Sequence, residues 1–281
     1  MKLPISVIVL TYNEEQNIED CLKGISGLFE VVFVVDSFST DKTLALARKF
    51  TEHIYEHPFE NYSVQRNWAQ ANLPIRTEWV LHLDADEQIT PELLDNLNKI
   101  FSHLPIKSDG FLVSRRTIFR GRWIKHGGHY PVYHLRTFKK HLGKCEERLY
   151  DQHFLLEGKI AKIKGDIINV ITGDLNLWQA RHRKWASLEA EEVLLSKERI
   201  KKNVDSSANP IEARRWLRYN RYYKMPLFIR PFMYFFYRYI IKLGFLDGIE
   251  GLVFHFYQGL WYRLIVDINI YKLKRKTQCI S

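Results

Sequence analysis

The stretch "EWVLHLDADEQITPELLDNL", from Glu78 to Leu97, joins an apolar run to the start of a helix through a cluster of acids. The run "WVLHLD" is predicted to be a buried strand, because it is short, apolar and does not alternate with polar residues. Thr90 and Pro91 suit the N-cap and first position of a helix. Asp84, Asp86 and Glu87 therefore stand at the tip of a buried strand.

Strand and helix patterns alternate through the first hundred residues. Apolar runs at Ile5–Leu10 and Glu30–Asp36 resemble the one before Asp84, and residues at helical spacing lie between the runs. Strands that are continuously apolar, without polar residues at every second position, indicate a mostly parallel sheet covered by helices on both faces when helices separate them. The predicted fold class is α/β.

Each predicted strand ends in polar residues: "TYNEE" after the first, "DSFSTD" after the second and "DADE" after the later one. In parallel α/β sheets, ligands bind beyond the carboxyl ends of the strands. Three such clusters at one edge favour a binding site over solvated loop ends.

The chain has 281 residues, of which 46% are hydrophobic, and a net charge of +10. This charge favours an anionic partner, whether nucleic acid, a phosphorylated substrate or an acidic membrane surface. No segment approaches the ~20 uninterrupted apolar residues that a membrane-spanning helix needs.

Two carboxylates spaced as in "DAD" supply the hard oxygen ligands that Mg²⁺ or Mn²⁺ prefers. Such a metal bridges phosphate oxygens and neutralises a departing diphosphate. The alternative is an acidic start to the following helix, and Glu87 is expected to do no more than that.

The pattern changes after Gly110. "GFLVSRRTIFRGRWIKHGGHYPVYHLRTFKK" is basic and alternating, which predicts antiparallel strands. Gly127 and Gly128 would let backbone approach a ligand closely, and His129, His134 and Arg136 would meet sugar or phosphate. The alternative for the His126–His134 region is a turn between strands.

Three motifs in order, "VIVLTYNEE", "VVDSFSTDKT" and "HLDADE", resemble the inverting glycosyltransferases of family two, over about residues 1–160. "QRNWA", "CEERLYDQHF" and "FLDGIEG" are similar to a bacterial branch that builds lipopolysaccharide core and other surface glycans. The resemblance implies a GT-A fold, a nucleotide-diphospho-sugar donor, expected to be a UDP-sugar, and a divalent cation.

The resemblance also implies roles for single residues. Asp84 and Asp86 would hold the metal, with Asp86 the direct ligand. The nucleotide-sugar would be bound by Asp84 together with Thr11, Asn13, Glu14, Asp36, Gln65 and Arg66.

An inverting transfer needs a general base on the acceptor hydroxyl. Glu147 and Asp151 are the two candidates, with a slight preference for Glu147. Family members commonly have an acid pair ending in Asp. This chain has Glu146 and Glu147 there, so the choice of base stays open.

From Ala213 to Leu246 the chain has no acid, eight Lys or Arg residues and twelve aromatic residues. Aromatic residues with basic neighbours suit a membrane interface. A packed helical subdomain or single-stranded nucleic-acid binding are the alternatives. Membrane contact is the preferred interpretation, and no nucleic-acid partner is expected.

The sequence thus predicts a catalytic domain over residues 1–175 and a helical, membrane-associating region over 176–281. Residues 1–105 would bind the donor and 106–175 the acceptor. The expected activity is hexose transfer to a sugar hydroxyl of a lipid-linked glycan, at the cytoplasmic face of the inner membrane. The alternatives are transfer to a polyprenyl phosphate and, more distantly, non-enzymatic nucleic-acid binding.

Overall fold

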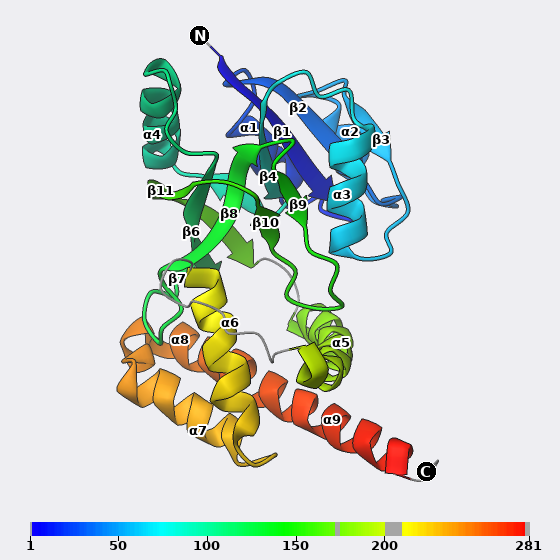
Figure 1. The fold of residues 1–281 in the computed structure, drawn as a ribbon, viewed down its shortest axis with the longest axis vertical. Helices are drawn as coiled ribbons and strands as arrows, with labels where there is room; N and C mark the ends of the chain where they lie inside the picture. The colour runs from blue at the N-terminus through cyan, green and yellow to red at the C-terminus, as the bar shows by residue number, and fades with distance from the viewer. Residues whose placement is uncertain (1, 172–174, 200–209, 279–281) are drawn as a thin grey trace. The chain divides into compact units, whose positions relative to one another are not determined.

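The computed structural model describes residues 2–171, 175–199 and 210–278 (Figure 1). These residues form two compact units. The first comprises residues 1–118, 132–147 and 152–172, and the second comprises 119–131, 148–151 and 173–281. The predicted domain boundary at residue 175 stays a prediction.

The first unit contains the sheet and four helices. Its strands are β1 (Leu3–Thr11), β2 (Phe29–Asp36), β3 (Ile54–Glu56), β4 (Trp79–Asp84), β5 (Glu87–Ile89), β6 (Gly110–Phe119), β8 (Val132–Lys139), β9 (Gly143–Cys145), β10 (Phe154–Leu156) and β11 (Ile160–Ile171). Its helices are α1 (Ile18–Lys23), α2 (Thr43–Ala47), α3 (Tyr62–Asn72) and α4 (Pro91–Ser102).

The strand order across the sheet is β3-β2-β1-β4-β8-β6-β11-β5. β1, β2, β3 and β4 pair in parallel, and β8 pairs antiparallel with both β4 and β6. The α/β class and the antiparallel strands predicted after Gly110 are therefore confirmed.

Helices cover both faces of the sheet, as the unalternated strands predicted. On one face, Leu81 and Leu83 of β4 share a core with Ile18 of α1 and Leu93 of α4. On the other face, His82 is hydrogen-bonded to Gln70 of α3. Burial on both sides explains why the run before Asp84 has no exposed position.

The register brings the polar strand ends together. Thr11 of β1 lies opposite Asp36 of β2, and Leu10 lies opposite Asp84 of β4. Because the three strands are parallel, the clusters that follow them meet at one edge of the sheet.

The second unit is mainly helical. It contains the short strand β7 (Arg122–Trp123) and the helices α5 (Leu175–Arg199), α6 (Pro210–Asn220), α7 (Arg230–Phe236), α8 (Gly248–His255) and α9 (Tyr262–Gln278). Its described residues also include two 3₁₀ turns, η1 (Tyr222–Lys224) and η3 (Gly244–Asp247), and two π-helical stretches, η2 (Tyr237–Ile241) and η4 (Phe256–Trp261).

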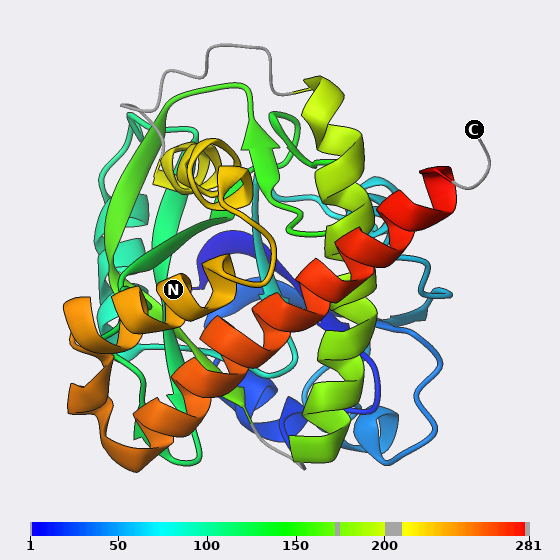
Figure 2. The same ribbon diagram turned by 90° about the horizontal axis from the view of Figure 1, so that it is seen from below.

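Helix α9 runs across α5, and the two share a buried core that includes Ala186, Ala190 and Val266 (Figure 2). Glu189 is buried in this core, where it accepts hydrogen bonds from Tyr262 and Arg263. Among the described helices, none is both long and apolar enough to cross a bilayer.

Candidate functional site

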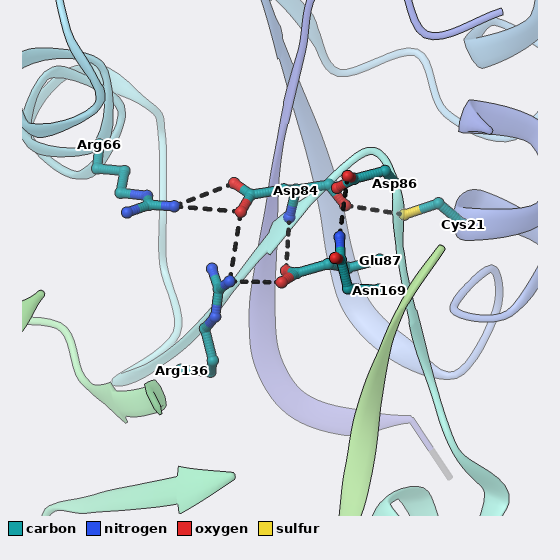
Figure 3. Close-up of polar contacts among 7 residues, drawn as sticks. All are labelled: Cys21, Arg66, Asp84, Asp86, Glu87, Arg136 and Asn169. Atoms are coloured by element: carbon teal, nitrogen blue, oxygen red, sulfur yellow. Dashed lines mark hydrogen bonds and ion pairs between the residues drawn. The ribbon is translucent and has the colours of Figure 1, made fainter. Parts of the chain in front are cut away.

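Asp84, the last residue of β4, is held by two arginines (Figure 3). Arg66 of α3 lies 3.1 Å from its Oδ1, and Arg136 of β8 lies 3.3 Å from its Oδ2. Burial alone would raise the pKa of this carboxyl, but the charges of Arg66 and Arg136 hold the pKa well below its usual range. Asp84 is therefore ionised, and both of its oxygens are occupied.

Glu87 does not contribute to the start of α4, so that expectation was wrong. It begins β5 and is buried, and its Oε1 lies 2.5 Å from Arg136 (Figure 3). Its Oε2 accepts a hydrogen bond of 3.0 Å from the backbone N–H of Asp84. Thr90 caps α4 instead. Glu87 thus braces the turn between β4 and β5 from the inside.

Asp86 has a different environment from Asp84. Its Oδ2 accepts a hydrogen bond of 2.9 Å from Asn169 of β11, and no Lys or Arg of the described residues forms an ion pair with it (Figure 3). Burial, followed by the negative charges of Glu87 and Asp84, raises the pKa of Asp86 to about 7. Asp84 and Glu87 each contact an arginine, so Asp86 is the acid of this turn without a positively charged neighbour among the described residues.

The donor set fits a hard divalent cation held by a single protein carboxylate. Such ions commonly bind one or two carboxylates and complete their coordination with substrate phosphates and water. Asp86 is suited to this role, and Asp84 less so because two guanidinium groups already occupy it. Within the described residues, no group of three His, Cys, Asp or Glu side chains is placed to hold a metal.

The turns after β1 and β2 are tied together. Asn13 has a positive φ of 52°, its backbone N–H donates to Ser39, and its side-chain oxygen accepts from the N–H of Thr40. Asp36 is buried, and both of its oxygens accept hydrogen bonds from Ser39. Asp36 therefore shapes the turn, and its contact with a base stays a prediction.

Thr11 is the last residue of β1, and Glu14 lies in the turn that follows it. The Thr11 hydroxyl is buried and has no hydrogen-bond partner among the described residues. The backbone N–H of Glu14 donates to Thr43, and its carboxylate accepts a bond of 2.6 Å from Asn17. An unsatisfied buried hydroxyl at the carboxyl edge is consistent with a ligand there.

Gln65 and Arg66 are adjacent in sequence but have separate roles. The Gln65 amide donates to the Ser37 hydroxyl and the His57 carbonyl, so it links α3 to the segment after β2. Arg66 points to Asp84 (Figure 3). Of the two, only Arg66 contacts the acids of the β4–β5 turn.

The two candidate bases belong to different units. Glu147 lies in the first unit with a side chain 77% exposed, and its ion pair with Lys144 lowers its pKa. Asp151, in the second unit, has a φ of 59° and lies 2.8 Å from Arg218 of α6. Which of the two is the base stays a prediction.

The glycines of "HGGHY" allow a close approach, but the neighbour of Gly127 is the protein itself. A Cβ on Gly127 would lie 2.2 Å from the ring of His255. His126 is bound to Asp247 through its backbone N–H and its ring. Arg136, from the same stretch of sequence, contacts Asp84 and Glu87 rather than a solvent-exposed surface.

Asn169 was not predicted as a site residue. It lies in "IINVIT", an apolar stretch that indicates only a short strand. The one available signal was a single amide in an apolar run. The strand position of Asn169, paired with Glu87, places its side chain against Asp86.

In α/β proteins, a parallel half-sheet with polar turns at its carboxyl edge binds ligands at that edge. The chain belongs to glycosyl transferase family 2, whose family model matches residues 6–155. The predicted family is confirmed.

Curated relatives match part of the chain. An uncharacterized glycosyltransferase of Rickettsia bellii is 34% identical over 98 residues, which is 35% of this chain and 33% of that protein. The lipopolysaccharide core biosynthesis glycosyltransferase LpsC of Rhizobium meliloti is 31% identical over 131 residues, 43% of this chain and 45% of LpsC. The chain thus spans less than half the length of these two relatives.

A solved structure matches nearly the whole chain. The mannosyltransferase PcManGT of Pyrobaculum calidifontis, determined with GDP-Man and Mn²⁺, superposes with a TM-score of 0.54 at 17% identity. The match covers 96% of this chain and 86% of PcManGT. It confirms the predicted GT-A fold.

Proposed function

We propose that the protein is an inverting glycosyltransferase that moves a hexose from a UDP-sugar to a sugar hydroxyl of a lipid-linked glycan, such as lipopolysaccharide core. The observation that carries this proposal is the β4–β5 turn. There Asp84 is paired with two arginines, whereas Asp86 forms no ion pair with a Lys or Arg of the described residues. Membership of family 2 and the likeness to LpsC support the reaction and the acceptor class.

A divalent cation bound at Asp86 would neutralise charge on the departing diphosphate. Arg66 and Arg136 hold Asp84 in its ionised form, and Glu87 fixes the backbone of the turn. The positions of the site side chains are thereby set before the donor binds, which lowers the cost of ordering them.

The transfer is a single displacement. The acceptor oxygen forms a bond to the anomeric carbon, the bond from that carbon to the diphosphate oxygen breaks, and the acceptor proton passes to a carboxylate. Glu147 is paired with Lys144 and Asp151 with Arg218, so each is held as a carboxylate by a neighbouring cation. Either can therefore accept a proton, and we propose that one of them does.

We also propose that the enzyme works at the cytoplasmic face of the inner membrane. The reason is the acceptor: a glycan attached to a lipid stays at the membrane surface, and an enzyme that acts on it has to reach that surface. The basic and aromatic composition of residues 213–246 supports this location.

Donor hydrolysis is the direct test. UDP-hexoses and GDP-hexoses are incubated with the protein, with and without Mn²⁺, and release of the nucleotide is measured. We expect Mn²⁺-dependent turnover of a UDP-sugar, reduced at least ~100-fold in Asp86→Asn. Asp95→Asn, an exposed acid on α4, is the matched control and should be unchanged. Equal turnover by Asp86→Asn would refute the proposed role of the turn.

Replacing each candidate base identifies the acceptor class. With a sugar hydroxyl as acceptor, either Glu147→Gln or Asp151→Asn should lose about 10²–10⁴-fold in transfer while donor binding persists. A phosphate acceptor is already anionic and needs no base. Full activity in the double variant would therefore favour transfer to a polyprenyl phosphate instead.

A further inference from the structure

The continuous helix formed by α7 and η2 exposes an apolar stripe along its length. Its members recur three or four residues apart, which is the spacing of one helix face. They are Ile229, just before α7, then Phe232, Met233, Phe236, Tyr237, Ile240 and Ile241.

The opposite side of this helix carries the charged groups, and it is buried. Arg230 is 2% exposed and donates to Asp267 of α9, which is fully buried. Arg238 is also buried and donates to the backbone carbonyl of Gly127. A helix on the surface of a water-soluble protein has the reverse arrangement, with apolar groups inward and charges outward.

Exposed apolar residues also follow η2 along the chain. Leu243, Phe245 and Leu246 are exposed around η3, and Ile249 of α8 is 76% exposed. Leu252 and Phe256 extend the surface along α8 and into η4. The elements contact one another, α7 with η4 and η2 with η3 and α8, so these residues belong to one packed body. We call the α7–η2 stripe and these residues the outer apolar face.

The charges near the outer apolar face are mostly positive, and Glu250 of α8, between Ile249 and Leu252, is a partly exposed acid. Arg221, Lys224 and Lys242 are exposed, and no acid occurs from Ala213 to Leu246. Asp247, the next acid along the chain, is buried and bound to His126. From Ala213 to Leu246 the exposed charges are therefore all cationic, which matches an anionic headgroup layer.

A second copy of the chain fits this surface less well. A symmetric dimer would bring the same cations of both copies toward one another, since both partners use the same patch. Lipid provides apolar chains for the stripe and anionic groups for Lys242, whose ammonium lies 5.7 Å from the ring of Tyr237. Tyrosine and lysine together at an apolar border are typical of a membrane interface.

We propose that the outer apolar face is a bilayer-contacting surface that inserts into one leaflet, with α7 and η2 lying in the plane of the interface. The twelve residues of α7 and η2 (7 and 5) rise only about 18 Å, which is less than the hydrocarbon thickness of a bilayer. The purpose of the surface, access to a lipid-linked acceptor, rests on the proposed function. The surface itself rests on the exposed residues and their charge.

Vesicle co-sedimentation of the full chain tests the proposal. Vesicles of phosphatidylethanolamine with phosphatidylglycerol are compared with vesicles of phosphatidylcholine. The triple variant Phe232→Ser, Phe236→Ser and Ile241→Ser should weaken binding by about tenfold or more for each residue. Lys242→Gln should weaken binding to the anionic vesicles about fivefold and leave the neutral vesicles unaffected. Leu195→Ser, at a position 59% exposed on α5, is the control and should bind like the unaltered protein.

The outcomes separate this proposal from the proposed function. Unchanged sedimentation of the triple variant, with circular dichroism equal to that of the unaltered protein, would overturn the bilayer assignment. The assignment would also be overturned if the unaltered protein did not bind vesicles and instead formed a dimer in analytical ultracentrifugation that the triple variant does not form. If vesicle binding depends on the outer apolar face but no UDP-sugar is turned over, the proposed function is refuted and the proposed bilayer contact stands. The triple variant should retain donor hydrolysis, because its residues lie outside the donor site.

Discussion

Asp84 and Asp86 are two residues apart, yet their carboxyls have opposite pKa shifts. Two guanidinium groups lower the pKa of Asp84, whereas burial and neighbouring acids raise that of Asp86 to about 7. The site therefore has one carboxylate whose charge is balanced within the protein and one that needs an external cation.

This difference predicts an effect of pH on stability without metal. The folded pKa of Asp86 lies above its unfolded value, so the folded state binds more protons between about pH 4 and pH 7, and stability falls as pH rises through that range. Asp86→Asn cannot ionise. It should match the unaltered protein near pH 4 and be about 2–4 kcal/mol more stable at pH 8. Urea unfolding in metal-free buffer measures this difference.

The same unfolding measurement with Mn²⁺ added tests whether Asp86 binds the metal. The metal should stabilise the unaltered protein at pH 8 and leave Asp86→Asn unaffected, because a ligand that binds only the folded state shifts the equilibrium toward it. Parallel stability curves for the two proteins from pH 4 to pH 8 would contradict the assigned environment of Asp86.

At the scale of elements, α4 and β11 meet through a glycine. Gly165 has a φ of +97°, and a Cβ there would lie 2.3 Å from the backbone N of Leu93. The neighbouring Thr90 both caps α4 and exchanges hydrogen bonds with the backbone of Asp166. The lack of a side chain at Gly165 thus lets the start of α4 lie against the strand.

Gly165→Ala should destabilise the protein by about 2–4 kcal/mol, since it adds an overpacking cost to the strain of a positive φ. Gly27→Ala is the matched control, because Gly27 also has a positive φ of +74° but has no atom within 4 Å of the added Cβ. That control should lose only about 1 kcal/mol. Thermal or urea unfolding measures the stability of both variants. Equal losses of stability in Gly165→Ala and Gly27→Ala would show that the contact with Leu93 contributes nothing.

At the scale of the whole molecule, each of the two units combines an apolar core with ion pairs. The first has an apolar core around β1 and β4. The second has an apolar core between α5 and α9 and, inside its helical body, ion pairs such as Arg230 with Asp267. Removing one member of a buried pair leaves the other charge uncompensated, which commonly costs about 3–5 kcal/mol.

Asp267→Ala should therefore speed amide hydrogen exchange in α7 and α9 while exchange in β1 and β4 stays close to that of the unaltered protein. Adding Arg230→Met to Asp267→Ala should recover part of the loss, because the unpaired charge is then removed as well. A uniform rise in exchange over both units would instead show that the chain opens as a single cooperative unit.

The sequence by itself determined the α/β class, the main strands and the edge at which the acids gather. Continuous apolar runs such as Ile5–Leu10 require cover on both faces, and parallel strands place their carboxyl ends side by side. These properties follow from local periodicity. The order of the motifs was also sufficient to identify the family.

Only the tertiary structure decided which charges are balanced. Arg136 is 52 residues from Asp84 in sequence, and Asn169 is 83 residues from Asp86. In the basic, aromatic stretch, composition alone did not show that Arg230 and Arg238 point inward while the apolar side chains face outward. The reason is physical: pKa and burial depend on groups brought together by folding, and no local pattern of residues records those neighbours.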